Sequence, residues 1–143
     1  MGTGRKGGGL KPIRAKISKS INVGSWINVA DNSGAKIAKV VNVRNYHGVK
    51  DRQPKCGVGD TVFVVIKKGS PDTVHKKFPA VIVRQKKEFR RLDGTRVAFE
   101  DNACALVKDI DKYEPQGTIL RGPLPKEISI RFPHITKISS KVV

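Results

Sequence analysis

Residues 78–107 read FPAVIVRQKKEFRRLDGTRVAFEDNACALV: an apolar run, a dense basic run, an Asp93-Gly94 turn and an alternating return. Asp-Gly between two extended segments is one of the strongest hairpin signals, because a two-residue type I′ turn needs positive φ at both central positions. The stretch therefore predicts a protruding hairpin. Short β-rich segments on both sides of it predict a mainly β protein.

Counting outward from a two-residue turn gives the register that we expect for this hairpin. The facing pairs would be Leu92 with Thr95, Lys87 with Glu100, and Lys86 with Asp101. Opposite charges that face each other on neighbouring strands stabilise a hairpin by about 0.2–1 kcal/mol per pair.

The basic run concentrates positive charge near the tip of this hairpin. Within eight residues Glu88 is the only acid among five cations: Arg84, Lys86, Lys87, Arg90 and Arg91. Such a density is self-repelling unless a polyanion neutralises it. The run therefore predicts contacts with phosphate groups.

The composition of the whole chain agrees with this interpretation. The 143 residues include 29 Lys plus Arg and 12 Asp plus Glu, which gives a formal net charge of +17. A charge this large favours a nucleic-acid or membrane-surface partner. At 38% hydrophobic residues the chain can still bury a core, and its length suits one domain. We interpret residues 1–17 as a flexible basic arm and residues 18–143 as a single domain.

Upstream of the hairpin the chain alternates between β-rich runs and turns. Residues 25–30 and 35–44 predict two strands that are separated by Asp-Asn-Ser-Gly, whose members tolerate left-handed backbone or bond to their own main chain. In the second strand, alternation predicts that Ile37, Val41 and Val43 share the buried face. Residues 61–66 and 80–83 predict central strands.

The other segments of the chain are expected to be connections or short helices. Residues 45–59 predict a loop, and residues 67–77 a loop or a short helical turn. Arg-Gly-Pro at 121–123 is expected to end the strand pattern, and residues 126–132 and 133–137 to form short helices packed outside the sheet. Several short strands with Gly-rich turns favour a small closed barrel or a sandwich, and a barrel removes exposed strand edges.

Nothing in the sequence predicts an enzyme, a cofactor or a metal site. Gly2, Gly4 and Gly7 match G-x-G-x-x-G, but no strand precedes them, so the dinucleotide interpretation fails. The three histidines lie in separate segments. Cys56 and Cys104 lack neighbouring ligands at zinc-site spacing and are interpreted as reduced apolar residues. No secretory signal or membrane span is recognisable, so we expect a cytoplasmic protein with no membrane partner.

Aromatic residues make up only 6% of the chain, and Phe89 is the only one in the basic run. A barrel that binds single strands usually displays several aromatics for base stacking. Contacts are therefore expected mainly with the phosphate and sugar of folded RNA.

Seven short motifs, in this order, resemble one family, that of the universal large-subunit ribosomal protein fourteen, in its archaeal and eukaryotic branch. They are NVADNSGAK at 28–36, GVGD at 57–60, KKG at 67–69, AVIVR at 80–84, DG at 93–94, FEDN at 99–102 and RGP at 121–123. Each motif is weak alone, but their order and spacing together are specific.

The resemblance implies a closed five-stranded barrel with short C-terminal helices, and a structural constituent of the large ribosomal subunit. Its implied partners are large-subunit rRNA, small-subunit rRNA across an intersubunit bridge, and neighbouring proteins such as ribosomal protein three of the large subunit. An exposed face could dock the factor that keeps free subunits apart. A eukaryotic source would add transit through the nucleolus.

The residues expected to contact RNA fall into two ranks. The hairpin supplies the first rank, which consists of Arg84, Lys86, Lys87, Arg90, Arg91 and Arg96. The second rank consists of Arg14, Lys16, Arg44, Lys50, Arg52, Lys67, Lys68, Lys76 and Lys77.

Two other classes of function are compatible with some of these sequence features. A free-standing regulator or chaperone that binds nucleic acid transiently would also need the charge and the barrel. An RNA-processing enzyme would need a catalytic cluster that the sequence does not display. Cofractionation with ribosomes separates the first alternative from a structural constituent.

Overall fold

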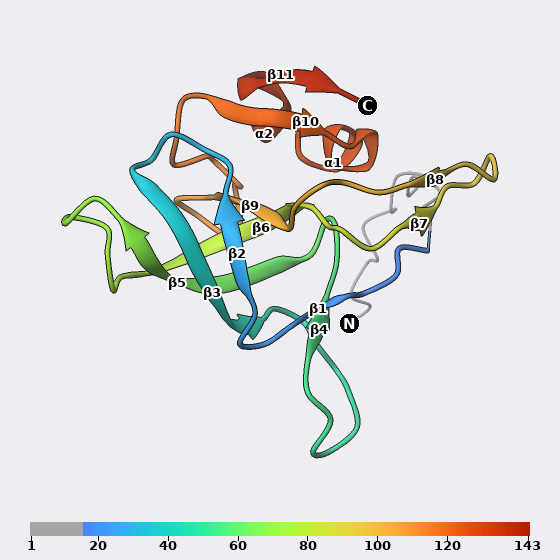
Figure 1. Cartoon of the computed structure of the whole chain (residues 1–143), viewed down its shortest axis with the longest axis horizontal. Helices are drawn as coiled ribbons and strands as arrows, with labels where there is room; N and C mark the ends of the chain where they lie inside the picture. The colour runs from blue at the N-terminus through green and yellow to red at the C-terminus, as the bar shows by residue number, and fades with distance from the viewer. Residues whose placement is uncertain (1–15) are drawn as a thin grey trace, which may run out of the picture.

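The computed structural model describes residues 16–143, and within them five strands close into a barrel (Figure 1). Neighbouring strands are antiparallel except β2 and β9, which close the barrel in parallel through Asn28 and Ala103. In barrel order the strands are β2 (Trp26–Val29), β3 (Ala35–Val43), β5 (Thr61–Gly69), β6 (Lys77–Arg84) and β9 (Ala103–Leu106). The mainly β, closed-barrel prediction is confirmed. Residues 1–15, with most of the expected basic arm and Arg14, lie outside the described residues.

Small and β-branched side chains fill the barrel, and Val64, Ile66 and Ile82 are completely buried. The expected buried face of β3 is right for Val43, which is buried, but wrong for Val41, and Ile37 is only half-buried. The inward residues of β3 include Ala38 and Val40, whereas Val41 is exposed. Three irregularities in the pairing of β3 with β5 shift the alternation along the strand, because each bulge changes which face the following side chains occupy.

The turn between β2 and β3 forms as its residues predict. The Asp31 carboxylate accepts hydrogen bonds from the Ser33 hydroxyl (2.6 Å) and the Leu106 amide (3.0 Å), and Gly34 adopts a φ of +93°. Burial raises the pKa of Asp31, although these hydrogen bonds act in the opposite direction. This carboxylate fixes the turn to strand β9.

The hairpin exists, but its predicted register is wrong. Strands β7 (Phe89–Arg90) and β8 (Arg96–Val97) pair Phe89 with Val97 and Arg90 with Arg96. The Gly94 amide donates to the Arg91 carbonyl (3.0 Å), and of the two expected turn residues only Gly94 has positive φ (+90°). The loop therefore has three residues, 92–94, as in a type I turn followed by a glycine bulge.

This shift of one residue removes the expected charge pairs. Asp101 pairs with Arg84 instead of Lys86, and the Lys86 amide donates to the Asn102 side chain. Paired strand geometry ends at Val97, so Lys87 and Glu100 do not face each other on adjacent rungs.

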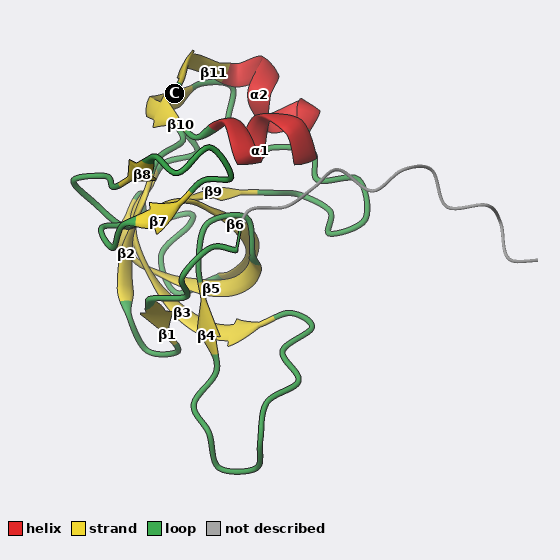
Figure 2. Cartoon of the chain, turned by 90° about the vertical axis from the view of Figure 1, so that its right-hand side faces the viewer, coloured by secondary structure: helices red, strands yellow, loops and turns green. Residues whose placement is uncertain are grey.

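Two segments expected to be loops contain additional strand structure. Strand β1 (Ile21–Asn22) pairs with β4 (Lys55–Cys56), which lies inside the expected loop 45–59. Strand β5 continues to Gly69, so the connection to β6 is shorter than residues 67–77. What remains of the first loop projects away from the barrel (Figure 2).

The C-terminal segment covers one side of the barrel (Figures 1 and 2). Helices α1 (Lys126–Arg131) and α2 (Pro133–Ile138) confirm the two expected short helices, and Ile128 and Phe132 are buried in a second core outside the barrel. The expectation that Arg-Gly-Pro ends the strand pattern is wrong. Strand β10 (Leu120–Leu124) runs through it and pairs in parallel with β11 (Ser139–Val142), with an irregular register that accommodates Gly and Pro.

Both cysteines are buried and free, which confirms their interpretation as reduced apolar residues. Burial is the main cause that raises the pKa of the Cys56 thiol to about 12, and it also raises the pKa of Cys104. Neither thiol therefore ionises readily at neutral pH.

Candidate nucleic-acid interface

Most of the predicted contact residues that the structure describes are accessible to a partner. Arg44, Lys67 and Arg91 are half-buried, Arg84 is buried, and Arg14 lies before the first described residue. Those with exposed side chains are Lys16, Lys50, Arg52, Lys68, Lys76, Lys77, Lys86, Lys87, Arg90 and Arg96.

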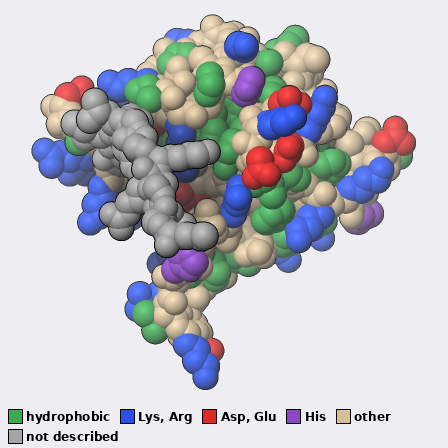
Figure 3. Space-filling model, turned by 180° about the vertical axis from the view of Figure 1, so that it is seen from behind, with side chains coloured by type: hydrophobic (Ala, Val, Ile, Leu, Met, Phe, Trp, Pro, Cys, Tyr) green, Lys and Arg blue, Asp and Glu red, His purple; other side chains and the backbone are tan. Residues whose placement is uncertain are grey.

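The fold distributes these cations over three projections instead of one patch. In Figure 1 the β7–β8 hairpin extends to one side of the barrel, the turn between β5 and β6 to the opposite side, and the connection from β3 to β4 downward. Seen from behind, Lys and Arg side chains occupy the lower projection and both flanks (Figure 3). Such an arrangement suits a partner that wraps around the barrel.

At the hairpin, local contacts hold the cations outward. Arg96 forms an exposed ion pair with Glu88 (Nη1–Oε1 2.6 Å), and its partner across the strands, Arg90, is exposed. The Asp93 carboxylate accepts from the Thr95 hydroxyl (2.7 Å) and amide (2.9 Å), and these bonds lower the pKa of Asp93. The turn is thus fixed without using any of the basic side chains.

The other two projections present lysines and an arginine on turns. Lys68, Lys76 and Lys77 lie around the β5–β6 connection, where Lys77 also sits 5.0 Å from the centre of the Phe63 ring. Lys50 and Arg52 lie in the connection from β3 to β4. Lys50, Arg52, Lys68 and Lys76 are exposed and can reach an anionic partner, whereas the Nζ of Lys77 lies over the Phe63 ring in a cation–π contact.

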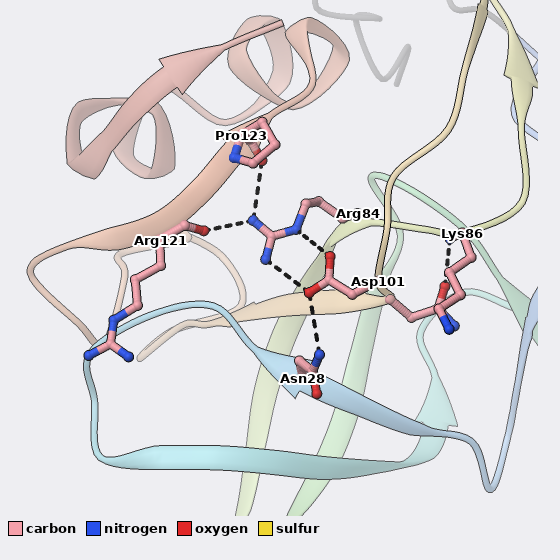
Figure 4. A network of polar contacts seen from close by, with 7 residues as sticks. Asn28, Arg84, Lys86, Asp101, Arg121 and Pro123 are labelled. Carbon is pink, nitrogen blue, oxygen red and sulfur yellow. Dashed lines mark hydrogen bonds and ion pairs between the residues drawn. The ribbon is translucent and has the colours of Figure 1, made fainter.

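Arg84 lies inside a polar network instead of on the surface (Figure 4). Its Nε and Nη2 donate to the two carboxylate oxygens of Asp101 at 3.0 and 3.2 Å, and its Nη1 donates to the carbonyl oxygens of Arg121 (2.7 Å) and Pro123 (3.3 Å). Asn28 donates to the same carboxylate at 3.3 Å. The guanidinium therefore joins β2, β6, β10 and the segment before β9.

The contacts of this network determine the direction in which the pKa of Asp101 is shifted. Burial disfavours its charged form, but the hydrogen bonds and charge of Arg84, assisted by Asn28, outweigh burial, and the pKa of Asp101 is lowered. The ion pair is therefore intact at neutral pH. Because its donors are engaged within the protein, Arg84 is placed to support the fold.

Arg91 is also engaged internally. Its Nε and Nη2 donate to the Glu127 carboxylate at 2.7 and 3.3 Å, and Nη2 also donates to the Val143 carbonyl at 2.8 Å. Side-chain exposure is only 13% for Arg91 and 17% for Glu127. Through these contacts Arg91, which lies next to the hairpin turn, holds the hairpin against helix α1 and Val143.

Five exposed cations on the C-terminal segment are absent from the predicted set: Arg121, Lys126, Arg131, Lys137 and Lys141. For this segment the sequence predicted short helices packed outside the sheet, and none of its cations was predicted to contact RNA. The Arg121 carbonyl accepts a hydrogen bond from Arg84, whereas the Arg121 side chain points away from this network (Figure 4). The sequence feature that could have drawn attention to Arg121 is its position in the Arg-Gly-Pro motif at 121–123.

No cluster of three or more His, Cys, Asp or Glu side chains suited to a metal ion occurs among residues 16–143. Within the same range, none of the helices has the length and apolar character needed to cross a bilayer.

Comparison with known proteins decides the family. A sequence profile described as ribosomal protein L14p/L23e matches residues 20–143, nearly the whole of the chain that the structure describes. The chain belongs to the ribosomal protein L14p/L23e family. The resemblance seen in the sequence motifs is thus confirmed, and with it the expectation that the protein is not an enzyme, because this is a family of structural ribosomal proteins.

Archaeal relatives named large ribosomal subunit protein uL14 match over 134 residues, which cover 94% of this chain and 100% of theirs. Identity is 49% with the protein of Nanoarchaeum equitans, 48% with that of Methanothrix thermoacetophila and 44% with that of Methanocorpusculum labreanum. These matches agree with the archaeal and eukaryotic branch suggested by the sequence.

Proposed function

We propose that the protein is a structural constituent of the large ribosomal subunit that binds large-subunit rRNA. The observation that carries this proposal is membership of the L14p/L23e family along nearly the whole chain, in a molecule with a net charge of +17. In this role no bond is made or broken. The cations reduce the repulsion between RNA phosphates that pack closely around the barrel.

The exposed cations of the three projections make the RNA contacts in this proposal. The hairpin contributes Lys86, Lys87, Arg90 and Arg96, and the turns contribute Lys50, Arg52, Lys68, Lys76 and Lys77, with Lys16 near the start of the described chain and Lys67 and Arg44 half-buried. Arg84 and Arg91 act from inside, since they fix the base of the hairpin and the C-terminal segment. Arg14 is included among the proposed RNA contacts only because of its positive charge.

Projections on opposite sides of the barrel can engage different partners at the same time. We propose that one set faces large-subunit rRNA while another reaches small-subunit rRNA and contributes to an intersubunit bridge. Neighbouring large-subunit proteins such as ribosomal protein three, and the subunit anti-association factor, are the protein partners in this proposal. The place of action is the cytoplasmic ribosome.

The salt dependence of binding to transcribed large-subunit rRNA tests the electrostatic part of this proposal. About eight neutralised phosphates give a slope of log K against log salt near −6 to −7, at roughly 0.7–0.9 per contact. A slope near −1 or no preference for this rRNA over an unrelated transcript of equal length would contradict it.

A further inference from the structure

A small polar hollow lies where one end of the barrel meets the C-terminal helices. Its volume is about 130 Å³. Segments far apart in the chain supply the side chains that matter here: Lys19, Arg44, Asp60, Thr61, Tyr113 and Arg131.

Positive charge and hydroxyl groups converge on this hollow. Lys19, Arg44 and Arg131 are cationic, and Asp60 is the one carboxylate that lines it. The Asp60 carboxylate already accepts from the Gly57 amide at 2.8 Å, and its ion pair with Lys19 is long, at 4.0 Å. An excess of two positive charges therefore faces the hollow.

The Arg44 guanidinium has donors to spare. It reaches the Tyr113 hydroxyl at 3.5 Å and the Asp111 carboxylate at 4.0 Å, and Asp111 itself is 87% exposed. A guanidinium carries five N–H donors in a planar fork that matches the oxygens of a phosphate. These two long contacts leave most of that fork available.

Neighbouring groups hold the hollow in shape. The Tyr113 and Thr61 hydroxyls lie 3.2 Å apart, so when Thr61 donates to Tyr113, the Tyr113 hydrogen can point to a bound acceptor. The Tyr113 ring packs on Phe132 with centroids 4.7 Å apart, and Arg131 donates to the Gly59 carbonyl at 2.9 Å. The donors are thus positioned before any ligand arrives.

Positive φ occurs at two positions on the rim of this hollow, and it is strained at Tyr113 but not at Asn45, because asparagine adopts the left-handed region readily. Asn45 has a φ of +58° and Tyr113 a φ of +54°. Positive φ is uncommon for residues other than glycine, and more so for a bulky one such as tyrosine. Strained residues of this kind gather at ligand sites, where the surrounding structure maintains them.

We propose that this hollow binds one phosphate group, with Arg44 and Arg131 as its charged donors, Lys19 at its edge and the Tyr113 hydroxyl as a neutral donor. The phosphate is either a phosphodiester of bound RNA or a free phosphate ion. The first source rests on the proposed rRNA-binding function, whereas the second does not.

Phosphate titration of the protein, followed by ¹H–¹⁵N NMR at constant ionic strength set with chloride, tests the hollow directly. Saturable shifts are expected at the Arg44 and Arg131 side-chain Nε–H groups and at the Tyr113 amide. Arg44→Gln is expected to weaken phosphate binding about tenfold or more, and Tyr113→Phe about threefold, since a charge-assisted hydrogen bond contributes more than a neutral one. Lys36→Gln is the matched control, because Lys36 is exposed near the opposite end of strand β3.

Binding of the same variants to transcribed large-subunit rRNA distinguishes the two sources. If an RNA phosphate fills the hollow, Arg44→Gln and the charge-neutral Tyr113→Phe weaken rRNA binding more than Lys36→Gln does. If a free ion fills it, both variants bind phosphate more weakly, but in rRNA affinity Arg44→Gln matches Lys36→Gln and Tyr113→Phe matches wild type.

The inference is overturned if phosphate gives no saturable shifts at the hollow and if, on rRNA, Arg44→Gln matches Lys36→Gln and Tyr113→Phe matches wild type. A wild-type protein that binds phosphate in the hollow but has no affinity for rRNA would contradict the proposed function and leave the phosphate site standing.

Discussion

The Arg84 guanidinium and the Asp101 carboxylate form two parallel hydrogen bonds, of 3.0 and 3.2 Å, beneath the surface of a protein with a net charge of +17. The same arginine bonds to two carbonyl oxygens of strand β10. The first cation of the basic run is therefore committed to the fold. The next ones, Lys86 and Lys87, are exposed.

Arg84→Ala is expected to destabilise the protein by about 3 kcal/mol, because it leaves the Asp101 carboxylate without its charged partner and two carbonyl oxygens without their Arg84 donor. Urea unfolding followed by circular dichroism measures this change. Arg121→Ala is the control, since the Arg121 side chain points outward and its carbonyl remains; we expect a change within about 0.5 kcal/mol. Equal unfolding midpoints for Arg84→Ala and wild type would contradict the role given to Arg84.

The contribution of Asp101 to stability is expected to depend on pH. Because the folded state lowers the pKa of Asp101 from 3.8, its carboxylate stabilises the fold above pH 3.8, and this stabilisation is lost as the pH falls through the folded-state value. Unfolding free energies of wild type and Asp101→Asn should therefore converge as the pH is lowered below about 3.8. A difference that stays constant between pH 7 and pH 3 would exclude this ionisation as the source.

Arg90 and Arg91 are neighbours but should respond differently to substitution. Arg90→Ala is expected to weaken rRNA binding and to reduce the salt slope by roughly 0.7–0.9, the effect of one phosphate contact. Arg91→Ala should instead lower the free energy of unfolding by about 2 kcal/mol, because Glu127 loses its partner. Filter binding over a salt series and urea unfolding, applied to both variants, check the distinction; identical behaviour would contradict it.

The two thiols should be unreactive in the folded protein. Burial raises the pKa of both Cys56 and Cys104, and the thiolate is the reactive form. Ellman's reagent at pH 8 is expected to give no rapid reaction in buffer and two thiols per chain in denaturant. A rapidly labelled thiol in the native protein would show that the barrel opens locally.

The alternation of β-branched runs and turn residues at short intervals predicted a small barrel or a sandwich, and the family resemblance implied the closed five-stranded barrel. The register could not be predicted, because pairing shifts depend on contacts between strands. The bulges of β3 expose Val41, and one extra loop residue, Leu92, shifts the hairpin so that Lys87 does not face Glu100. Strand β10 was missed because Gly122 and Pro123 normally weaken strands, and its pairing with β11 involves the last residues of the chain.

Net charge predicted the kind of partner but not the task of each cation. Arg84 and Arg90 cannot be distinguished by their positions in the basic run. Only the folded structure shows that Arg84 contacts Asp101 and strand β10. The polar hollow has no sequence signature, because Lys19, Arg44, Tyr113 and Arg131 come from separate segments. Three-dimensional contacts were needed for both.

Sedimentation of a cell lysate on sucrose gradients, with and without about 0.5 M salt, tests the central claim most directly when this protein is quantified by mass spectrometry. Because affinity that rests on phosphate contacts alone falls steeply with salt, a protein bound only by charge leaves the subunit at this strength, whereas an integral constituent is also retained by the folded RNA and proteins packed around it. We expect one copy per large subunit in both gradients. Protein that stays at the top of the gradient, or leaves the subunit substoichiometrically in salt, would contradict a structural role and favour a transient regulator.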